Sequence, residues 1–377
     1  MKRFGSDGRI AMFLPSLHGG GAERSTLRLA QGLIQRGIEV DLVLARAEGP
    51  LRECVPPEVR VYDLATPRVL RSLAPLVFYL RKERPDGIIS AMDHANIVAI
   101  AAVQIARVPC TLIVVVHSTV SVSFANSKQH RARWIPWLAR WLYPKANWVV
   151  AVSKAVKQDV VSLYALPPEK VQVIYNPVVT PDLLRASLEP VSLPWSDAPS
   201  APLLLSVGRL VPAKDFPTLL RAFAEIRSRM DARLIILGEG EQRAMLENQA
   251  RQLGIEHAVA FPGFVSNPYA YMRHSNVFVL PSRWEGLPGA LIEALACGTP
   301  VVATDAPGGS REILEDGKWG KLVPVGDWKA MAEAIIETLR QPVPREWLQQ
   351  RAQEFTIDRS TQAYLRLLRG SLWVGPF

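Results

Sequence analysis

The sequence predicts an α/β protein built of two doubly wound parallel-sheet domains. The chain has 377 residues, and domains of roughly 150 residues make two or three of them the expectation. Short apolar runs alternate with amphipathic stretches in both halves, as in sheets whose strands are joined by helices. This pattern stops at a proline-rich segment and then restarts. Apolar residues make up 49% of the chain, which favours large cores over disorder.

The first half is expected to form an N-terminal domain over residues 1–180. A strand is predicted at Ile10–Leu14, followed by a helix at Ala22–Gln35. Further buried strands are predicted at Val40–Ala45, Gly87–Ser90, Thr111–His117 and Trp148–Val152. Strands bounded by turns and separated by helical segments favour a parallel sheet.

The second half is expected to repeat this plan. Five prolines between Pro177 and Pro199 predict a linker over residues 181–201. A second domain is predicted over residues 202–344, and residues 345–377 are expected to form a C-terminal helix that packs back on the first domain. The predicted strands are Leu203–Val207, Arg233–Leu237, Val259–Phe261, Val277–Leu280 and Val301–Ala303, and the predicted helices are Asp215–Arg229, Glu241–Leu253 and Pro288–Cys297.

Positive charge is concentrated in the first half of the chain. The net charge is +9. Residues 1–180 contain 23 lysines and arginines against 13 acidic residues, whereas residues 181–377 contain 21 against 22. The first domain is therefore expected to face an anionic partner or surface. Nucleic acid, acidic lipid and a phosphate-bearing substrate all remain open on charge alone.

Cysteine usage and hydropathy indicate the compartment. The three cysteines, Cys54, Cys110 and Cys297, are far apart and form no CxxC pair, so neither a disulfide framework nor a zinc site is expected. The most apolar stretch, Ile97–Ala106, is shorter than the roughly 20 residues that span a bilayer. We expect a cytoplasmic protein, or one at the cytoplasmic face of a membrane.

Three segments carry candidate chemistry, and the first is glycine-rich. Gly19, Gly20 and Gly21 lie between a predicted strand and a predicted helix. Backbone N–H groups there can approach a phosphate at a helix N-terminus. The segment is not the GxGxxG fingerprint, because Arg24 stands where the third glycine belongs. A tight strand-to-helix turn is the alternative.

The second segment is SVGRLVPAKDF, in which Gly208, Arg209 and Lys214 follow a predicted strand. The carboxyl ends of strands are where such sheets bind ligands. Arginine can hold phosphate oxygens bidentately, and lysine adds a point charge. The segment is no Walker loop, because Asp215 follows the lysine. Solvated cations in a loop are the alternative.

The third segment places two glutamates around a helix start. Pro288 and Gly298 bracket the helix. Glu285 precedes it, and Glu293 lies about 7 Å further along the axis. A diphosphate at the helix start would leave a sugar ring within reach of Glu293, whose carboxylate suits vicinal hydroxyls. The alternative is an ordinary buried helix with one paired glutamate.

These segments together resemble the retaining glycosyltransferases of GT-B fold, the group 1 family that includes bacterial mannosyltransferases, sucrose-phosphate synthases and lipid-linked glycan transferases. Glu285 and Glu293 match the family's glutamate, seven residues, glutamate pattern. GGGAE, VGRLVPAKDF, GEGEQR and EALACGTPVVAT follow in the expected order. The resemblance covers nearly the whole chain and implies two Rossmann-like domains facing each other across a cleft.

The resemblance also implies roles for single residues. Gly20 and Gly21 would lie near the donor diphosphate and the acceptor, and Arg209 and Lys214 would neutralise the diphosphate. Glu285 would contact the transferred sugar and Glu293 the ribose. The remaining donor-binding residues would be Gly208, Glu239 near the nucleobase, and Gly286, Leu287 and Pro288 at the helix start. His117, which ends a predicted strand, matches the family's histidine beside the transferred sugar, although a lone histidine there is more often structural.

The expected function is retaining transfer of a hexose or N-acetylhexosamine from a nucleotide sugar, with UDP favoured, to a lipid-linked or glycan acceptor. Retention follows from the resemblance. No Asp-x-Asp occurs, and fixed cations can stabilise a leaving diphosphate, so no metal or other cofactor is expected. The alternatives are an epimerase of the same fold, a non-catalytic protein that binds anionic lipid, and an inactive scaffold. No nucleic-acid module is recognised.

A final segment bears on the acceptor. In residues 128–148, Trp134, Trp137, Leu138, Trp141 and Leu142 share one helical face, and Arg133 and Arg140 lie opposite. Tryptophans with arginines suit a membrane interface, and arginines suit pyrophosphate oxygens. We expect peripheral contact at the inner face of the membrane. The alternative is that the tryptophans pack into the core.

Overall fold

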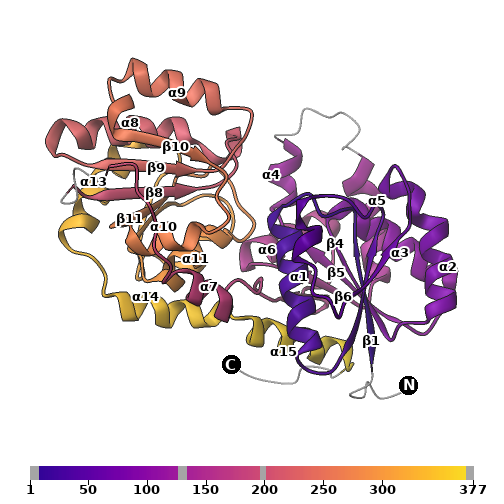
Figure 1. The fold of residues 1–377 in the computed structure, drawn as a ribbon. Coiled ribbons are helices and arrows are strands. Elements are labelled where there is room, and N and C mark those ends of the chain that lie inside the picture. The colour runs from indigo at the N-terminus through magenta and orange to yellow at the C-terminus, as the bar shows by residue number, and fades with distance from the viewer. Residues whose placement is uncertain (1–7, 126–133, 196–200, 371–377) are drawn as a thin grey trace. The chain divides into compact units, whose positions relative to one another are not determined.

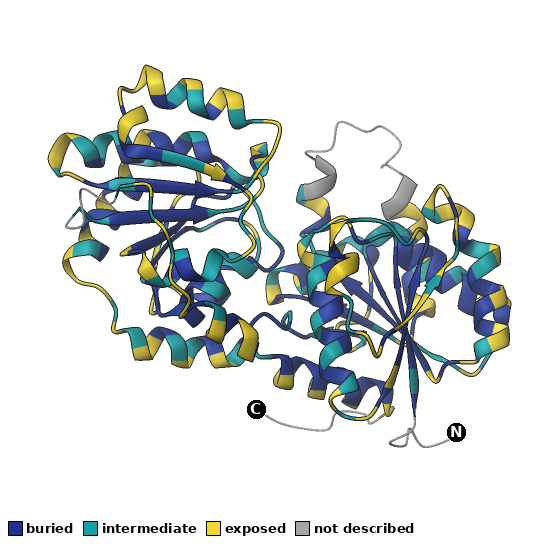
Figure 2. Cartoon of the chain, in the orientation of Figure 1, coloured by how far each residue is buried: buried dark blue, intermediate teal, exposed yellow. Residues whose placement is uncertain are grey.

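The computed structural model describes residues 8–125, 134–195 and 201–370, with the backbone alone for residues 123–125 and 134–136. The chain divides into two compact units (Figure 1). Unit 1 comprises residues 1–177 and 357–377, and unit 2 comprises residues 178–356. In each unit the strands are largely buried and the exposed residues gather on helices and loops (Figure 2).

Unit 1 is built on a seven-stranded sheet of order β3-β2-β1-β4-β5-β6-β7. All neighbouring strands are parallel. The strand order reverses between β1 and β4, so the carboxyl ends of these two strands flank the switch point at which such sheets bind ligands. The strands are β1 (Arg9–Leu14), β2 (Glu39–Leu44), β3 (Arg60–Asp63), β4 (Gly87–Ala91), β5 (Thr111–Val116), β6 (Trp148–Ala151) and β7 (Val171–Val173).

Seven α-helices are described in unit 1. They are α1 (Gly21–Ile34), α2 (Leu73–Glu83), α3 (Asp93–Ala106), α4 (Val120–Ala125), α5 (Trp134–Leu142), α6 (Lys154–Tyr164) and α15 (Ile357–Leu368). Helix α3 contacts both α2 and α5, and most of its side chains are buried. The most apolar stretch of the sequence is therefore a core helix of unit 1.

Helix α15 belongs to unit 1 because it packs on α1. A glycine at position 32 permits this approach, since a Cβ there would lie 2.1 Å from Thr361 Oγ1. Ser360 Oγ also donates a 2.8 Å hydrogen bond to Tyr175 O. The last described helix of the chain, α15, is thus part of the same unit as its first helix, α1.

Unit 2 has a six-stranded parallel sheet of order β10-β9-β8-β11-β12-β13. Its strands are β8 (Leu203–Val207), β9 (Arg233–Leu237), β10 (Val259–Gly263), β11 (Val277–Leu280), β12 (Val301–Thr304) and β13 (Lys321–Val323). Its helices are α7 (Pro181–Ala186), α8 (Phe216–Arg229), α9 (Arg243–Gln252), α10 (Pro268–His274), α11 (Gly289–Cys297), α12 (Ser310–Ile313), α13 (Trp328–Arg340) and α14 (Arg345–Ala352). Apolar residues of α8 and α13 bury one face of this sheet.

The predicted fold class, two Rossmann-like parallel-sheet domains, is confirmed by these two sheets. Two details of the domain plan differ. The segment predicted as a linker begins with α7, which Thr180 caps by accepting a hydrogen bond from Leu183 N at 2.9 Å and which belongs to unit 2. The single tail helix is instead two helices, because the chain turns at residues 353–356, and α14 stays in unit 2 while α15 joins unit 1.

Within the described ranges, no helix is both long enough and apolar enough to cross a bilayer.

Candidate active-site residues in each unit

The loops that follow β8 and β9 in unit 2 are joined backbone to backbone. Gly208 N donates to Leu237 O at 3.0 Å, and Leu210 N donates to Glu239 O at 2.9 Å. Gly238 has φ +132°, and a Cβ on it would lie 2.0 Å from Gly208 O. Only glycine fits there. These loops hold Gly208 and Arg209 at the carboxyl edge of the sheet, where the Arg209 side chain is exposed.

Lys214 and Glu285, both predicted as catalytic, meet in unit 2. Lys214 ends a short 3₁₀ turn, Pro212–Lys214, and its Nζ lies 2.5 Å from Glu285 Oε1. Ser282 Oγ donates to the same carboxylate oxygen at 2.7 Å. The two charged side chains are only 22% and 12% exposed. A carboxylate oxygen held by two donors is positioned for binding and is a poor covalent nucleophile.

Two glycines not singled out in the sequence support the Glu285 loop. Glu285 N donates to Pro307 O at 2.9 Å. Gly308 has φ +135°, and a Cβ on it would lie 2.2 Å from Glu285 O. A Cβ on Gly309 would lie 2.8 Å from Leu287 Cδ1. The loop after β12 therefore packs closely against the backbone of residues 285–287. The signal for it was the PGGS sequence, separated by two residues from a buried strand.

Helix α11 begins at this loop. Gly286, Leu287 and Pro288 are buried immediately before its first turn, and no side chain caps its N-terminus. N–H groups at an uncapped helix start, together with the helix dipole, form a ready anion site. Glu293 lies four residues into the helix, about 6 Å along the axis, and is partly exposed.

Glu239 lies over the end of β10. It forms an ion pair with Arg243, whose Nη2 donates to Phe261 O at 2.6 Å. A Cβ on Gly263, which has φ +87°, would lie 2.5 Å from Glu239 Oε1. The arrangement fixes Glu239 at the same edge of the sheet as Arg209 and Lys214.

The glycine-rich loop of unit 1 joins β1 to α1 as predicted. Gly21 is the first residue of α1, and a Cβ on it would meet no atom within 4 Å. A Cβ on Gly20 would lie 2.5 Å from Glu23 Oε2, and Glu23 is buried. A carboxylate this close opposes a bare phosphate at Gly20 and favours a ligand that donates hydroxyl hydrogens.

His117 follows β5 directly, one strand beyond the switch point between β1 and β4. Both of its ring nitrogens are shielded from solvent, and neither has a hydrogen-bond partner among the described residues. Burial lowers the pKa of His117 to about 4, so the ring is neutral at pH 7 and offers one donor and one acceptor. Unpaired buried polar atoms are rare, and a ligand that satisfies them is one explanation.

Sequence reasoning missed a group of polar residues after β4. Asn96 Nδ2 donates to Val115 O at 2.9 Å and to the Tyr143 hydroxyl at 3.1 Å. The other amide atom of Asn96, Oδ1, and Ser90 Oγ have no partner in the described part of the chain. Burial raises the pKa of Asp93 to about 6. The available signal was SAMDHAN, polar residues directly after the apolar run at Gly87.

Of the two arginines predicted to face the acceptor, Arg140 is exposed on α5. Arg133 lies outside the described residues. Trp137 and Trp141 are 64% and 65% exposed, and Leu138 is 37% exposed. The inner side of α5 is instead formed by residues such as Ala139, which is buried. The alternative that the tryptophans pack into the core is therefore wrong for Trp137 and Trp141, and the side chain of Trp134 lies outside the described part of the chain.

No group of three or more His, Cys, Asp or Glu side chains that could hold a metal ion occurs among residues 8–125, 134–195 and 201–370. Metal independence remains a prediction.

Two parallel-sheet domains, with cations and carboxylates at the carboxyl ends of their strands, form the arrangement that the resemblance to GT-B glycosyltransferases implies. Residues 19–181 match the family model described as Glycosyltransferase Family 4, and residues 196–355 match Glycosyl transferases group 1. Together these two matches take in most of the chain, and they identify glycosyltransferase domains, the second of them of group 1, in it.

Curated relatives agree with this assignment. The chain is 35% identical, over 52% of its length and 51% of the relative, to an N-acetylgalactosamine-N,N'-diacetylbacillosaminyl-diphospho-undecaprenol 4-alpha-N-acetylgalactosaminyltransferase of Campylobacter jejuni. It is 28% identical, over 96% of its length and 98% of the relative, to an alpha-1,4-N-acetyl-D-galactosaminyltransferase of the same species that is named for a PP-undecaprenol substrate. The chain spans about half the length of several curated relatives that it matches.

Solved structures share the fold. HepE of Anabaena, in complex with UDP-glucose, is similar with a TM-score of 0.77 at 24% identity, over 96% of this chain and 99% of that one. The lipopolysaccharide outer core galactosyltransferase WaaB is similar with a TM-score of 0.72 at 19% identity, over 96% of this chain and 99% of that one.

Proposed function

We propose that this protein transfers a hexose or N-acetylhexosamine from a UDP-sugar to a lipid-linked acceptor in bacterial glycoconjugate synthesis. The acceptor class is supported by three relatives whose names specify diphospho-undecaprenol or PP-undecaprenol substrates. The donor is supported by the UDP and UDP-glucose complexes of HepE. We place the reaction at the inner face of the membrane, where α5 contributes exposed tryptophans and Arg140.

One observation carries the proposal: the Lys214–Glu285 pair stands directly before the uncapped start of α11. A departing UDP develops negative charge on its diphosphate. Fixed cations and helix N–H groups stabilise this charge without reorganising. Arg209 and Lys214 supply the cations, Glu285 binds the transferred sugar, and Glu293 accepts hydrogen bonds from the ribose hydroxyls.

The reaction proposed is net retaining and independent of metal. Glu285 Oε1 is engaged by Lys214 and Ser282, so we assign no covalent nucleophile. The acceptor hydroxyl attacks the anomeric carbon on the face from which UDP leaves, and the departing phosphate accepts its proton. His117, neutral at pH 7 because burial lowers its pKa, hydrogen-bonds to the transferred sugar.

The test is a panel of UDP-sugars incubated with a short-chain prenyl-diphosphate glycan, with products read by mass spectrometry and the new anomeric centre by NMR. We expect one sugar to be added, with retained configuration. A UDP-sugar isomerised without an acceptor would instead indicate an epimerase. Binding of acidic lipid without turnover of any UDP-sugar would indicate a non-catalytic lipid-binding protein.

A further inference from the structure

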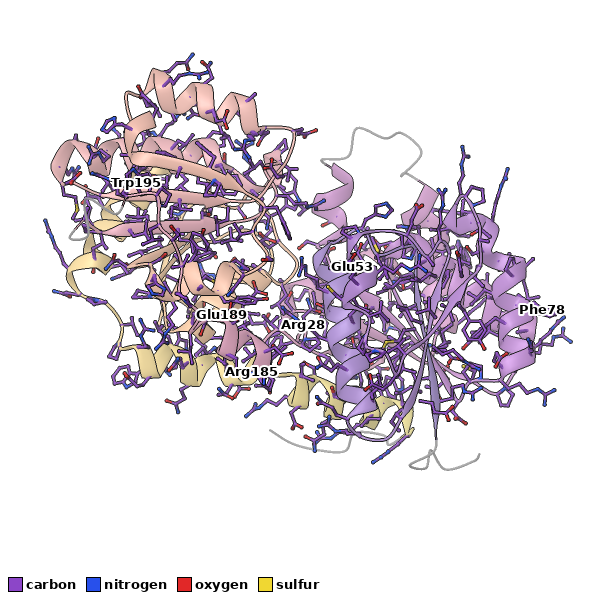
Figure 3. All side chains as sticks on the ribbon, in the orientation of Figure 1. Arg28, Glu53, Phe78, Arg185, Glu189 and Trp195 are labelled. Atoms are coloured by element: carbon purple, nitrogen blue, oxygen red, sulfur yellow. The ribbon has the colours of Figure 1, made fainter. Side chains whose placement is uncertain are left out.

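A second exposed apolar surface lies in unit 1, on helix α2 and the 3₁₀ turn Val69–Ser72 that precedes it. Leu70 and Phe78 are 69% and 68% exposed, and Ala74 between them is also exposed. Ala74 and Phe78 are four apart in α2 and so lie on one side of it, and Leu70 lies in the 3₁₀ turn directly before the helix. Phe78 projects from the outer side of α2 in Figure 3. We call these residues, with Ile105, the α2 ridge.

The exposed side chains of the α2 ridge do not contribute to the hydrophobic core of unit 1. The inner side of α2 is already apolar and buried through Leu76, Val77 and Leu80. Helix α2 covers α3 with this inner side. A helix on the surface of a soluble protein normally carries polar residues on its outer side. Large apolar side chains in that position indicate a contact made outside the folded unit.

Ile105 extends the ridge onto the end of α3. Arg81 Nη2 donates to Ile105 O at 3.0 Å, which fixes the end of α3 against the last turn of α2. Ile105 is itself 49% exposed. Phe78 is three residues before Arg81 and therefore lies on the same side of α2. An exposed apolar residue of α3, Ile105, thus lies beside the last turn of α2.

The charges around the ridge are mainly positive, with Asp63 and Asp86 as exposed acidic residues at its margins. The sequence has no acidic residue between Asp63 and Glu83, and none between Asp93 and Asp159. Glu83 is mostly buried and paired with Arg9 and Arg60. The exposed basic residues described on these helices and at their ends are Arg68, Arg71, Arg81, Lys82, Arg84, Arg107, Arg140 and Lys145.

We propose that the α2 ridge is a second membrane contact, which docks unit 1 on an anionic bilayer together with the exposed tryptophans of α5. Apolar side chains enter the headgroup boundary while the surrounding lysines and arginines attract acidic lipid. Both contacts are carried by helices that pack on α3. The proposal rests on the lipid-linked acceptor of the proposed function, because a bilayer is where that acceptor is found.

The experiment compares two double variants of the full chain. Leu70→Ser with Phe78→Ser removes the ridge. Leu188→Ser with Trp347→Ser is the matched control, since these residues are 66% and 58% exposed but belong to unit 2. Binding is measured by co-sedimentation with phosphatidylglycerol–phosphatidylethanolamine vesicles and with phosphatidylcholine vesicles. Transfer to a short-chain, water-soluble prenyl-diphosphate acceptor is measured in parallel.

We expect the wild type and the control to bind the anionic vesicles, and the ridge variant to bind about tenfold more weakly or worse. Raised salt should weaken binding, and phosphatidylcholine should bind little. The ridge variant should melt like the wild type and glycosylate the short-chain acceptor normally. If that acceptor is not glycosylated by the wild type, the proposed function fails, while the vesicle result still decides the ridge.

Three results would overturn the inference. The first is equal vesicle binding by the ridge variant and the wild type. The second is equal loss of binding in the control variant. The third is a wild-type dimer, detected by light scattering, that the ridge variant abolishes, because the ridge would then be an interface between two copies of the chain.

Discussion

Lys214 and Glu285 are 71 residues apart in the sequence, yet Lys214 Nζ lies 2.5 Å from Glu285 Oε1. Residues next to each member of the pair are fixed by further hydrogen bonds. Asp215, which follows the lysine, is buried and accepts hydrogen bonds from Thr218 Oγ1 and from Arg283 Nη2. Arg283 in turn is two residues before Glu285, and its backbone N donates to Ala213 O at 2.8 Å. The loop after β8 and the loop after β11 are therefore joined by several hydrogen bonds.

We predict that Lys214→Ala and Arg209→Ala each lower kcat by about 100-fold or more, the scale for losing one electrostatic partner of a transition state. Steady-state transfer to the prenyl-diphosphate acceptor measures this. Lys318→Ala, at an exposed lysine of unit 2, is the control and should leave kcat unchanged. Near-normal kcat in both active-site variants would remove these residues from the mechanism.

Transfer should not depend on a divalent metal. The positive charge that a metal would supply to the diphosphate is expected from Arg209, Lys214 and the start of α11. Activity is compared in excess chelator and in added magnesium or manganese. A reversible loss of nearly all activity in chelator would contradict the prediction.

Gly308→Ala should damage both stability and transfer. The new Cβ would lie 2.2 Å from Glu285 O, at a residue whose φ is +135°. Strain and displacement of the Glu285 loop together should cost about 2 kcal/mol or more of unfolding free energy. Gly289→Ala is the matched control for stability, since a Cβ there would meet no atom within 4 Å. Equal melting temperatures for the two variants would show that the close approach is unimportant.

The sequence predicted the long, well-bounded elements closely. Leu203–Val207, Arg233–Leu237 and Val277–Leu280 are strands with the predicted bounds. Each is a short, mainly apolar run bounded by turn residues, which is typical of a buried strand. The three- and four-residue edge strands β3, β7 and β13 were not predicted. Their residues are partly exposed, so pairing with a neighbouring strand, rather than an apolar run, makes them strands.

The site was predictable where it depends on one motif and not where it depends on packing. Lys214 and Glu285 were each predicted from their own segment, and the structure brings them together. The close packing at Gly308 and Gly309 could not be predicted, because it depends on how close one backbone passes to another. Asn96 was missed for a similar reason: its partners, Val115 O and Tyr143, come from other elements.

His117→Gln should change stability mainly in acid. Burial lowers the pKa of His117 from 6.5 to about 4, so the unfolded chain binds this proton more tightly than the folded one. The wild type therefore loses stability as the pH falls from about 6.5 towards 4. Glutamine does not titrate, so the fall in melting temperature between pH 7 and pH 5 should be smaller in the variant. An equal fall in melting temperature for the wild type and the variant would show that a group other than His117 causes the loss of stability in acid.

Asp93→Asn should have the opposite pH dependence. Burial raises the pKa of Asp93 from 3.8 to about 6, so the folded state holds this proton more tightly than the unfolded state. The stabilising effect is complete below about pH 4 and is lost as the pH rises through 6. Above that pH the wild type keeps a buried, ionised carboxylate, whereas asparagine stays neutral.

We therefore expect Asp93→Asn to be more stable than the wild type at pH 8, by up to about 3 kcal/mol, and nearly equal to it at pH 4. Chemical denaturation at the two pH values measures the difference. Asp86→Asn, at an exposed aspartate one element earlier, is the control. A gain for Asp93→Asn that is the same at both pH values would mean that packing, and not the ionisation of Asp93, sets its stability.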